Sequence, residues 1–123
     1  DNFLKELALA FEREDATAVT SFAWPDATVA GQKLDETRKL LHSGFMNMKD
    51  PKVSYTNTRL LQEGANAHVQ TNTSVTDGGV VRYTSPDTFK LERRSTPHLG
   101  GLINVYEWKV VNVQAQLPTE TGI

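Results

Sequence analysis

The sequence predicts an α+β protein in which helices pack on one face of a curved antiparallel sheet. Helical periodicity dominates the first 48 residues, and period-two patterning rich in Val, Thr, Tyr and Phe runs through the remainder. Glycine-containing reversals divide this second half into strands that follow one another along the chain. Helices first and a meander of strands afterwards are typical of the α+β class.

The length and composition of the chain predict one globular domain. Its 123 residues include 38% hydrophobic and 23% charged side chains, which is ordinary usage for a folded protein. We expect a single domain over residues 1–116 and a C-terminal tail over residues 117–123. The absence of cysteine excludes disulfides, thiolate metal sites and a cysteine nucleophile within this chain. We expect a soluble protein, either cytoplasmic or exported after cleavage of a leader.

The charge balance and the hydropathy pattern argue against two classes of partner. The 13 basic and 15 acidic side chains give a net charge of −2. This balance leaves no basic excess for a phosphate backbone, so we expect no nucleic acid partner. No apolar run approaches the roughly 18 residues that a membrane span needs, so we expect no membrane partner.

The first helix is predicted over residues 2–13, where apolar side chains recur at helical spacing. A second, two-turn helix is predicted over residues 16–23, with Asp15 as its N-cap because a carboxylate there can accept an orphan backbone N–H. Trp24 precedes Pro25, and a residue before proline resists helical backbone angles, so this helix should end there. The apolar face of the first helix comprises Phe3, Leu4, Leu7 and Phe11.

A short strand is predicted next, over residues 26–30. A third helix then begins at a second N-cap, Asp35, continues to about Met48 and is ended by Asp50 and Pro51. Its apolar stripe consists of Leu34, Thr37, Leu41, Phe45 and Met48.

Strands are predicted for the rest of the chain. The pair Asp77-Gly78 is a two-residue hairpin signal, and Gly64 and the pair Gly100-Gly101 mark the other two reversals. Pro86 cannot donate to a strand ladder, which suits a bulge or a sheet edge. The predicted strands cover residues 53–62, 66–76, 79–84, 88–94 and 104–116.

Four segments serve as landmarks along the chain. They are EREDATAVTSF at residues 12–22, PDATVAG at 25–31, DETRKLLHSGF at 35–45 and VYEWKVVNV at 105–113. In this order and at these distances they resemble the NTF2-like superfamily, in particular its SnoaL-like members, over nearly the whole chain. The resemblance implies a cone in which three helices and a curved sheet enclose an apolar pocket, frequently in a dimer.

The superfamily that the chain resembles includes ketosteroid isomerase-like enzymes, which need a carboxylate base and an oxyanion donor in an apolar pocket. The base of these enzymes follows the first strand, where this chain has Ala30 and Gly31. Their oxyanion tyrosine lies on the first helix, at the position of Leu7, which cannot donate a hydrogen bond. Ketosteroid isomerase-type catalysis is therefore not expected.

Two histidines are candidate catalytic residues. If the strands pair outward from the turn at 77–78, His68 lies directly opposite Asp87, and that carboxylate would fix the imidazole tautomer and raise its basicity. A bulge at Pro86 would instead move Asp87 to the other face of the sheet. His42 lies on the third helix and is either a pocket base or a residue at the boundary of the core.

No metal or nucleotide cofactor is expected. The three histidines, at positions 42, 68 and 98, share no metal-ligand spacing and no acidic cluster accompanies them. No Gly-rich loop follows a strand and opens a helix.

Two sets of side chains are expected to make contacts with other molecules. Aromatic residues on the apolar stripes are expected to line the pocket, where they would stack on a flat ligand. Polar and aromatic residues on the other face of the sheet are expected to form a homodimer interface. The predicted pocket residues are Phe11, Trp24, Phe45, Phe89 and Trp108. The predicted dimer residues are Tyr55, Asn57, His68, Asn72 and Tyr83.

The function that these observations favour is binding of a small apolar organic molecule in the pocket, without ketosteroid isomerase-type catalysis. One alternative is an isomerase, dehydratase or cyclase that uses His68 with Asp87, or that uses His42. A second alternative is a dimerisation module whose pocket is filled by its own side chains.

Overall fold

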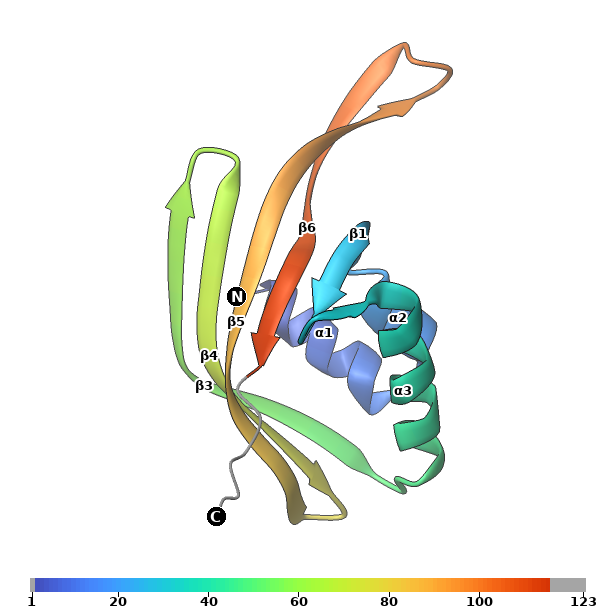
Figure 1. Ribbon diagram of the computed structural model, residues 1–123, viewed down its shortest axis with the longest axis vertical. Coiled ribbons are helices and arrows are strands. Elements are labelled where there is room, and N and C mark those ends of the chain that lie inside the picture. The colour runs from blue at the N-terminus through green and yellow to red at the C-terminus, as the bar shows by residue number, and fades with distance from the viewer. Residues whose placement is uncertain (1, 116–123) are drawn as a thin grey trace.

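A computed structural model describes residues 2–115, and in it three helices lie on one side of a six-stranded sheet (Figure 1). This arrangement confirms the predicted α+β class. The predicted tail, residues 117–123, lies outside the described residues. The helices are α1 (Asn2–Glu12), α2 (Ala16–Thr20) and α3 (Leu34–Met46). None of these described helices is long and apolar enough to cross a membrane.

The sheet is mixed rather than wholly antiparallel. Its strand order is β2-β1-β6-β5-β4-β3, and the one parallel pair within the described residues joins β1 to β6. The strands are β1 (Ala23–Val29), β2 (Gln32–Lys33), β3 (Pro51–Glu63), β4 (Asn66–Asp77), β5 (Val80–His98) and β6 (Ile103–Ala115).

The helix caps divide into one confirmed prediction and one error. Asp15 caps α2, because its carboxylate accepts a hydrogen bond from the backbone N–H of Ala18 at 3.0 Å. The N-cap of α3 is Lys33 rather than Asp35, and Lys33 makes no side-chain capping bond. Asp35 lies inside the first turn, where its negative charge interacts favourably with the helix dipole. Its carboxylate accepts a hydrogen bond from Arg38.

The segment around Trp24 and Pro25 is strand, not the end of a helix. The helix α2 ends at Thr20, and β1 begins at Ala23, three residues before the predicted strand. Extended backbone is what a pre-proline residue prefers, so the local preference was right and only the boundary was misplaced.

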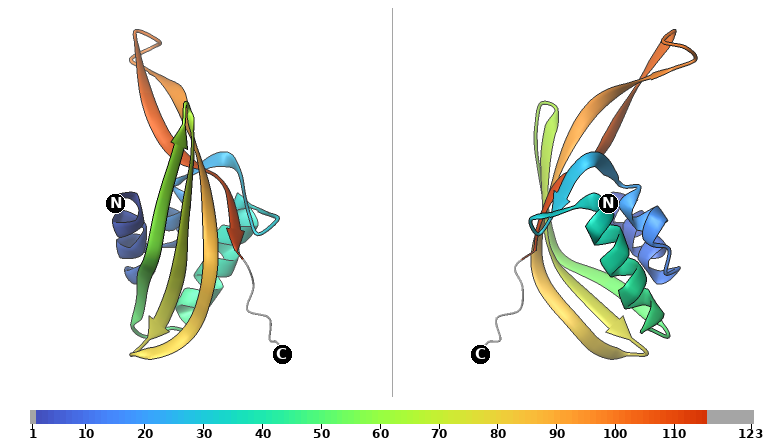
Figure 2. Two further views of the ribbon diagram at one scale, coloured as in Figure 1. Left: turned by 90° about the vertical axis from the view of Figure 1, so that its left-hand side faces the viewer. Right: turned by 45° about the vertical axis from the view of Figure 1, so that its right-hand side comes forward.

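The core lies between the helices and the inner face of the sheet. The sheet curves round the helices, as the turned views show (Figure 2). Alternate residues of β4 and β5 point inward and are buried, as the period-two pattern predicts. The central cluster of buried side chains comprises Leu4 from α1 with Ala67, Val69, Phe89, Leu91 and Val110 from the sheet.

The outer ends of β5 and β6 form a two-stranded arm that extends past the helices (Figure 1). Its tip exposes apolar side chains, among them Leu99, Leu102 and Tyr106. The Arg93 guanidinium lies 5.5 Å from the centre of the Tyr106 ring and 5.9 Å from that of Trp108. Trp108 pairs with Arg93 and is 36% exposed, so it is not part of the buried core.

Candidate functional site

A cavity of about 440 Å³ lies inside the cone, between the helices and the inner face of the sheet. A volume of this size is typical of small-molecule sites. Its wall is mostly apolar and draws on all three helices and on five of the strands, β1, β3, β4, β5 and β6. The lining side chains include Leu7, Phe11, Phe22, Leu34, Leu41, Met48, Val53, Tyr55, Val75, Tyr83, Asp87, Phe89 and Val113.

One carboxylate interrupts this apolar wall. Asp87 on β5 is 8% exposed, and it lies two residues before the core residue Phe89 on the same face of the strand. Its Oδ1 accepts a hydrogen bond of 2.9 Å from the Ser85 hydroxyl. The carboxylate is thus buried on the cavity side of the sheet with a neutral donor beside it.

A row of polar side chains crosses the inner face next to this carboxylate. Tyr55 on β3 pairs with Thr73 on β4, and Thr73 pairs with Ser85 on β5. Burial raises the pKa of the Tyr55 phenol, and the charge of Asp87 raises it further. Tyr55 therefore keeps its proton at every physiological pH and can donate a hydrogen bond into the cavity.

One hydroxyl near this carboxylate lacks a hydrogen-bond partner, and the carboxylate itself lacks a facing cation in the cavity. Thr73 is buried, and its hydroxyl oxygen has no hydrogen-bond partner in the part of the chain that the structure describes. Among the residues from 2 to 115, no lysine, arginine or histidine lines the cavity, so no cation faces the Asp87 carboxylate there. The cavity therefore has a negative electrostatic character on one wall and an apolar character elsewhere.

The predicted pairing of His68 with Asp87 is wrong. His68 pairs with Lys90 on the outer face, whereas Asp87 pairs with Thr71 on the inner face. Arg82 is an extra residue on β5, opposite no single partner on β4, and this bulge moves every later residue of the strand to the other face.

The bulge lies at a different place from the one expected. Val75 pairs with Tyr83, but the next residue, Thr76, pairs with Val81. The bulge thus lies at residue 82 and not at Pro86, and the turn itself occupies Gly78-Gly79 rather than Asp77-Gly78. Both glycines of this turn have positive φ, as a two-residue hairpin turn requires.

The other candidate base, His42, is exposed on α3 and does not line the cavity. No histidine among the described residues therefore faces the interior of the cone. Asp87 remains the one predicted catalytic candidate that borders the cavity within residues 2–115.

The predicted pocket aromatics divide between the cavity and other places. Phe11 and Phe89 line the cavity. Phe45 is buried behind Phe11, with their ring centres 4.9 Å apart, and does not reach the cavity. Trp24 does not line the cavity either, and its indole N–H donates a hydrogen bond of 2.8 Å to the backbone carbonyl of Glu92.

The predicted dimer residues also lie on two faces. Tyr55 and Tyr83 line the cavity, so their rings are on the inner face rather than on the proposed outer interface. Asn57, His68 and Asn72 remain with the polar outer face.

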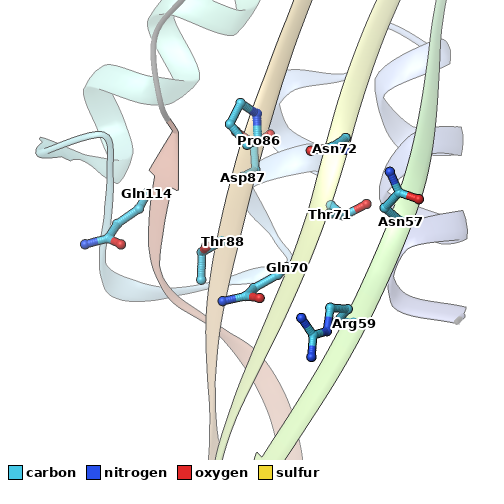
Figure 3. A pocket seen from close by; sticks show the side chains of 9 residues that line it. All are labelled: Asn57, Arg59, Gln70, Thr71, Asn72, Pro86, Asp87, Thr88 and Gln114. Carbon is cyan, nitrogen blue, oxygen red and sulfur yellow. The ribbon is translucent and has the colours of Figure 1, made fainter.

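A second, polar hollow of about 430 Å³ lies on that outer face, with the helices behind the sheet (Figure 3). Side chains of Arg59, Gln70, Thr88 and Gln114 project over it from four neighbouring strands. Their amides, hydroxyl and guanidinium offer hydrogen bonds to a polar molecule, but the hollow has no apolar wall comparable with that of the cone.

Sequence reasoning did not identify the polar row beside Asp87. A signal was present, because Ser85, Asp87, Phe89 and Leu91 alternate along one strand and therefore share a face. The two apolar members of this series mark the face as internal, and the carboxylate goes with them.

Comparison with known proteins finds neighbours in structure and none in sequence. No protein-family model and no curated protein matches the chain. A protein of unknown function from Nostoc punctiforme with a cystatin-like fold is 9% identical, with a TM-score of 0.72 over 97% of this chain and 88% of that chain. An NTF2-like protein from Novosphingobium aromaticivorans with a cystatin-like fold is 15% identical, with a TM-score of 0.70 over 98% of this chain and 80% of that chain.

A third neighbour, Bd1075 from Bdellovibrio bacteriovorus, is 12% identical, with a TM-score of 0.71. The match covers 98% of this chain but 40% of Bd1075, so the chain spans less than half the length of that protein. At these identities the likeness concerns the fold alone.

Proposed function

We propose that this chain, which has the NTF2-like fold, binds a small and largely apolar organic molecule inside its cone. The observation that carries the proposal is the cavity of about 440 Å³, walled by aliphatic and aromatic side chains. Apolar surface that leaves water for such a wall contributes roughly 25 cal/mol per Å². The described side chains leave this space open, which argues against a dimerisation module with a filled pocket.

The proposal excludes ketosteroid isomerase-type catalysis. Leu7 lines the cavity at the position where the resemblance places an oxyanion donor, and its side chain has no polar atom. Ala30 and Gly31 lie in a turn with positive φ after β1, and neither carries a carboxylate. Any chemistry in this cavity would need other residues.

Ligand binding can be tested by isothermal titration of the purified chain with a panel of steroids, polyketides and fatty acids. The variant Val113→Phe adds bulk to the cavity wall, and Val81→Phe adds the same bulk to an exposed position on β5. We expect the first variant to weaken binding and the second to leave it unchanged. Baseline heats for the whole panel, or equal weakening by both variants, would refute binding inside the cone.

A second candidate function is proton transfer by Asp87, with Tyr55 as the hydrogen-bond donor to the substrate. The specific observation in its favour is a buried carboxylate on an apolar wall beside a phenol that keeps its proton. The test is exchange of the α-protons of decalone in deuterated buffer, followed by NMR. Exchange that the protein accelerates and that Asp87→Asn abolishes would support an enzyme, and exchange at the buffer rate would exclude this reaction.

Homodimerisation through the outer face is a further part of the proposal. Three of the predicted dimer residues, Asn57, His68 and Asn72, belong to the outer face of β3 and β4. We expect a second copy of the chain to pack against this polar face. Sedimentation equilibrium tests it. A monomer at micromolar concentration would refute the dimer without affecting the cavity.

A further inference from the structure

We infer that the ligand of the cone is an amine, with an apolar body and one ammonium group that pairs with the Asp87 carboxylate. The inference rests on the proposed function, since it names the chemical class of the molecule that the cavity takes. Three observations support it, namely the missing counter-charge, the aromatic wall and the donor environment of the carboxylate.

The first observation is the missing counter-charge. Asp87 is 8% exposed, and the hydrogen bond from Ser85 is the one that the structure records for its carboxylate within residues 2–115. Buried carboxylates are normally paired with a cation, because an isolated buried charge is unfavourable. No described basic side chain lines the cavity, so a cation that meets Asp87 from the cavity side would come from the ligand.

The second observation is the aromatic wall around this charge. Phe89 is on the same strand face as Asp87, and the rings of Tyr55 and Tyr83 also line the cavity. The faces of aromatic rings attract cations, and carboxylates together with such rings favour ammonium groups. An anionic ligand would instead meet repulsion from Asp87 with no cation to offset it.

The third observation separates an ammonium from a neutral hydroxyl. One oxygen of the Asp87 carboxylate already accepts a hydrogen bond from Ser85. A hydroxyl on the ligand would donate a single further hydrogen bond to the carboxylate. An ammonium supplies three donors and a full positive charge, and charge-assisted hydrogen bonds are about twice as strong as neutral ones. The cavity should therefore distinguish an amine from an alcohol of the same shape.

The test is a calorimetric titration of the full chain at neutral pH with three matched probes. Naphthylethylamine, naphthylethanol and naphthylacetate share one ring system and differ in their polar end, which is a cation, a neutral group or an anion. We expect the amine to bind about tenfold or more tightly than the alcohol, and the alcohol to bind more tightly than the acid.

Two variants locate the preference. Asp87→Asn keeps the shape of the side chain and removes its charge, so it should bring the affinities of amine and alcohol together. Glu63→Gln removes an exposed charge at the end of β3, outside the cavity wall, and should leave the preference intact. If Asp87→Asn does not fold, the comparison of the three probes with the unaltered chain decides the question alone.

The outcomes separate the two proposals. Equal affinity for amine and alcohol, or a preference for the acid, would overturn the amine inference and leave binding in the cone intact. An amine preference that survives in Asp87→Asn would also overturn it. Absence of heat with all three probes and with the steroid, polyketide and fatty acid panel would refute the proposed function itself.

Discussion

Replacing Thr73 by Val should stabilise the free protein, which is the reverse of what most core substitutions do. Thr73 is 8% exposed, and no described group forms a hydrogen bond with its hydroxyl oxygen. A buried polar group without a partner costs about 1–3 kcal/mol. Valine has nearly the same shape and is also β-branched, so neither packing nor strand preference should suffer.

We take the lower end of that range, about 1 kcal/mol, as the expected gain. For a domain of this size, such a gain raises the melting temperature by about 4 °C. Urea unfolding followed by circular dichroism measures the free energy directly, and an unchanged slope with denaturant shows that the unfolded state is unaffected.

Thr71 supplies a matched control on the same strand and the same face. Its hydroxyl donates to the backbone carbonyl of Thr56 at 3.1 Å and also forms a hydrogen bond of 2.9 Å with the Thr58 hydroxyl. Thr71→Val therefore removes satisfied bonds and should destabilise the protein by about 1–2 kcal/mol. Two substitutions of the same chemistry should thus have opposite signs. Destabilisation by both would show that Thr73 has a partner in solution and would refute the reasoning.

Three further substitutions test the geometry of the fold. Asp77 accepts hydrogen bonds from two backbone N–H groups, and these lower the pKa of its carboxyl. The carboxylate therefore stabilises the fold at pH values above its unfolded pKa of about 4, and this stabilisation is lost as pH falls through the lower folded pKa. Asp77→Ala should destabilise the protein at neutral pH and make no difference in acid, which urea unfolding at a series of pH values would measure. Asp15→Ala removes the cap of α2 and should cost about 1 kcal/mol in the same assay, whereas Asp15→Asn should cost less. Trp24→Phe keeps most of the packing but removes the donor to Glu92, and it should cost about 1–2 kcal/mol by thermal unfolding.

The sequence was sufficient for the fold class because that class depends on periodicity averaged over many residues. The alternation along β4 and β5 survives an error of one residue at either end, and the helical stripes do as well. The parallel contact of β1 with β6 was not predicted, because it joins segments at the two ends of the chain and no local pattern reports it.

The candidate site depends on parity, which an error of one residue reverses. The misplaced turn shifts the pairing by two residues and leaves every side chain on its face, whereas the extra residue at Arg82, which was not predicted, reverses the faces. A bulge leaves no strong mark in a single sequence, since Arg82 is an ordinary strand residue with neither proline nor glycine beside it. For this reason His68 was assigned to the wrong partner, whereas Asp87, the other residue of the predicted pair, borders the cavity.

Aromatic residues misled the prediction of the pocket for a related reason. Trp24 and Phe45 are buried as their apolar surroundings suggest, but burial in a core and exposure to a cavity are different properties. Trp108 alternates with its neighbours as an inward-facing strand residue would, yet it is exposed, because alternation alone does not tell which part of a strand the helices cover. Which buried side chains line a cavity depends on how the helices and strands pack together, and the sequence pattern of a single strand does not report that packing.

Three features that do not favour stability occur together on the inner face of β3, β4 and β5. They are an open apolar cavity, a buried hydroxyl at Thr73 with no described partner, and a buried carboxylate at Asp87 that no described cation faces. Asp26, by contrast, accepts two hydrogen bonds from Arg94. Local departures from good packing and pairing are expected where a protein binds something, because the bound molecule supplies the missing contacts. Ligand binding should then raise the melting temperature, and it should do so more for an amine than for an alcohol of equal size, since the amine alone supplies the counter-charge.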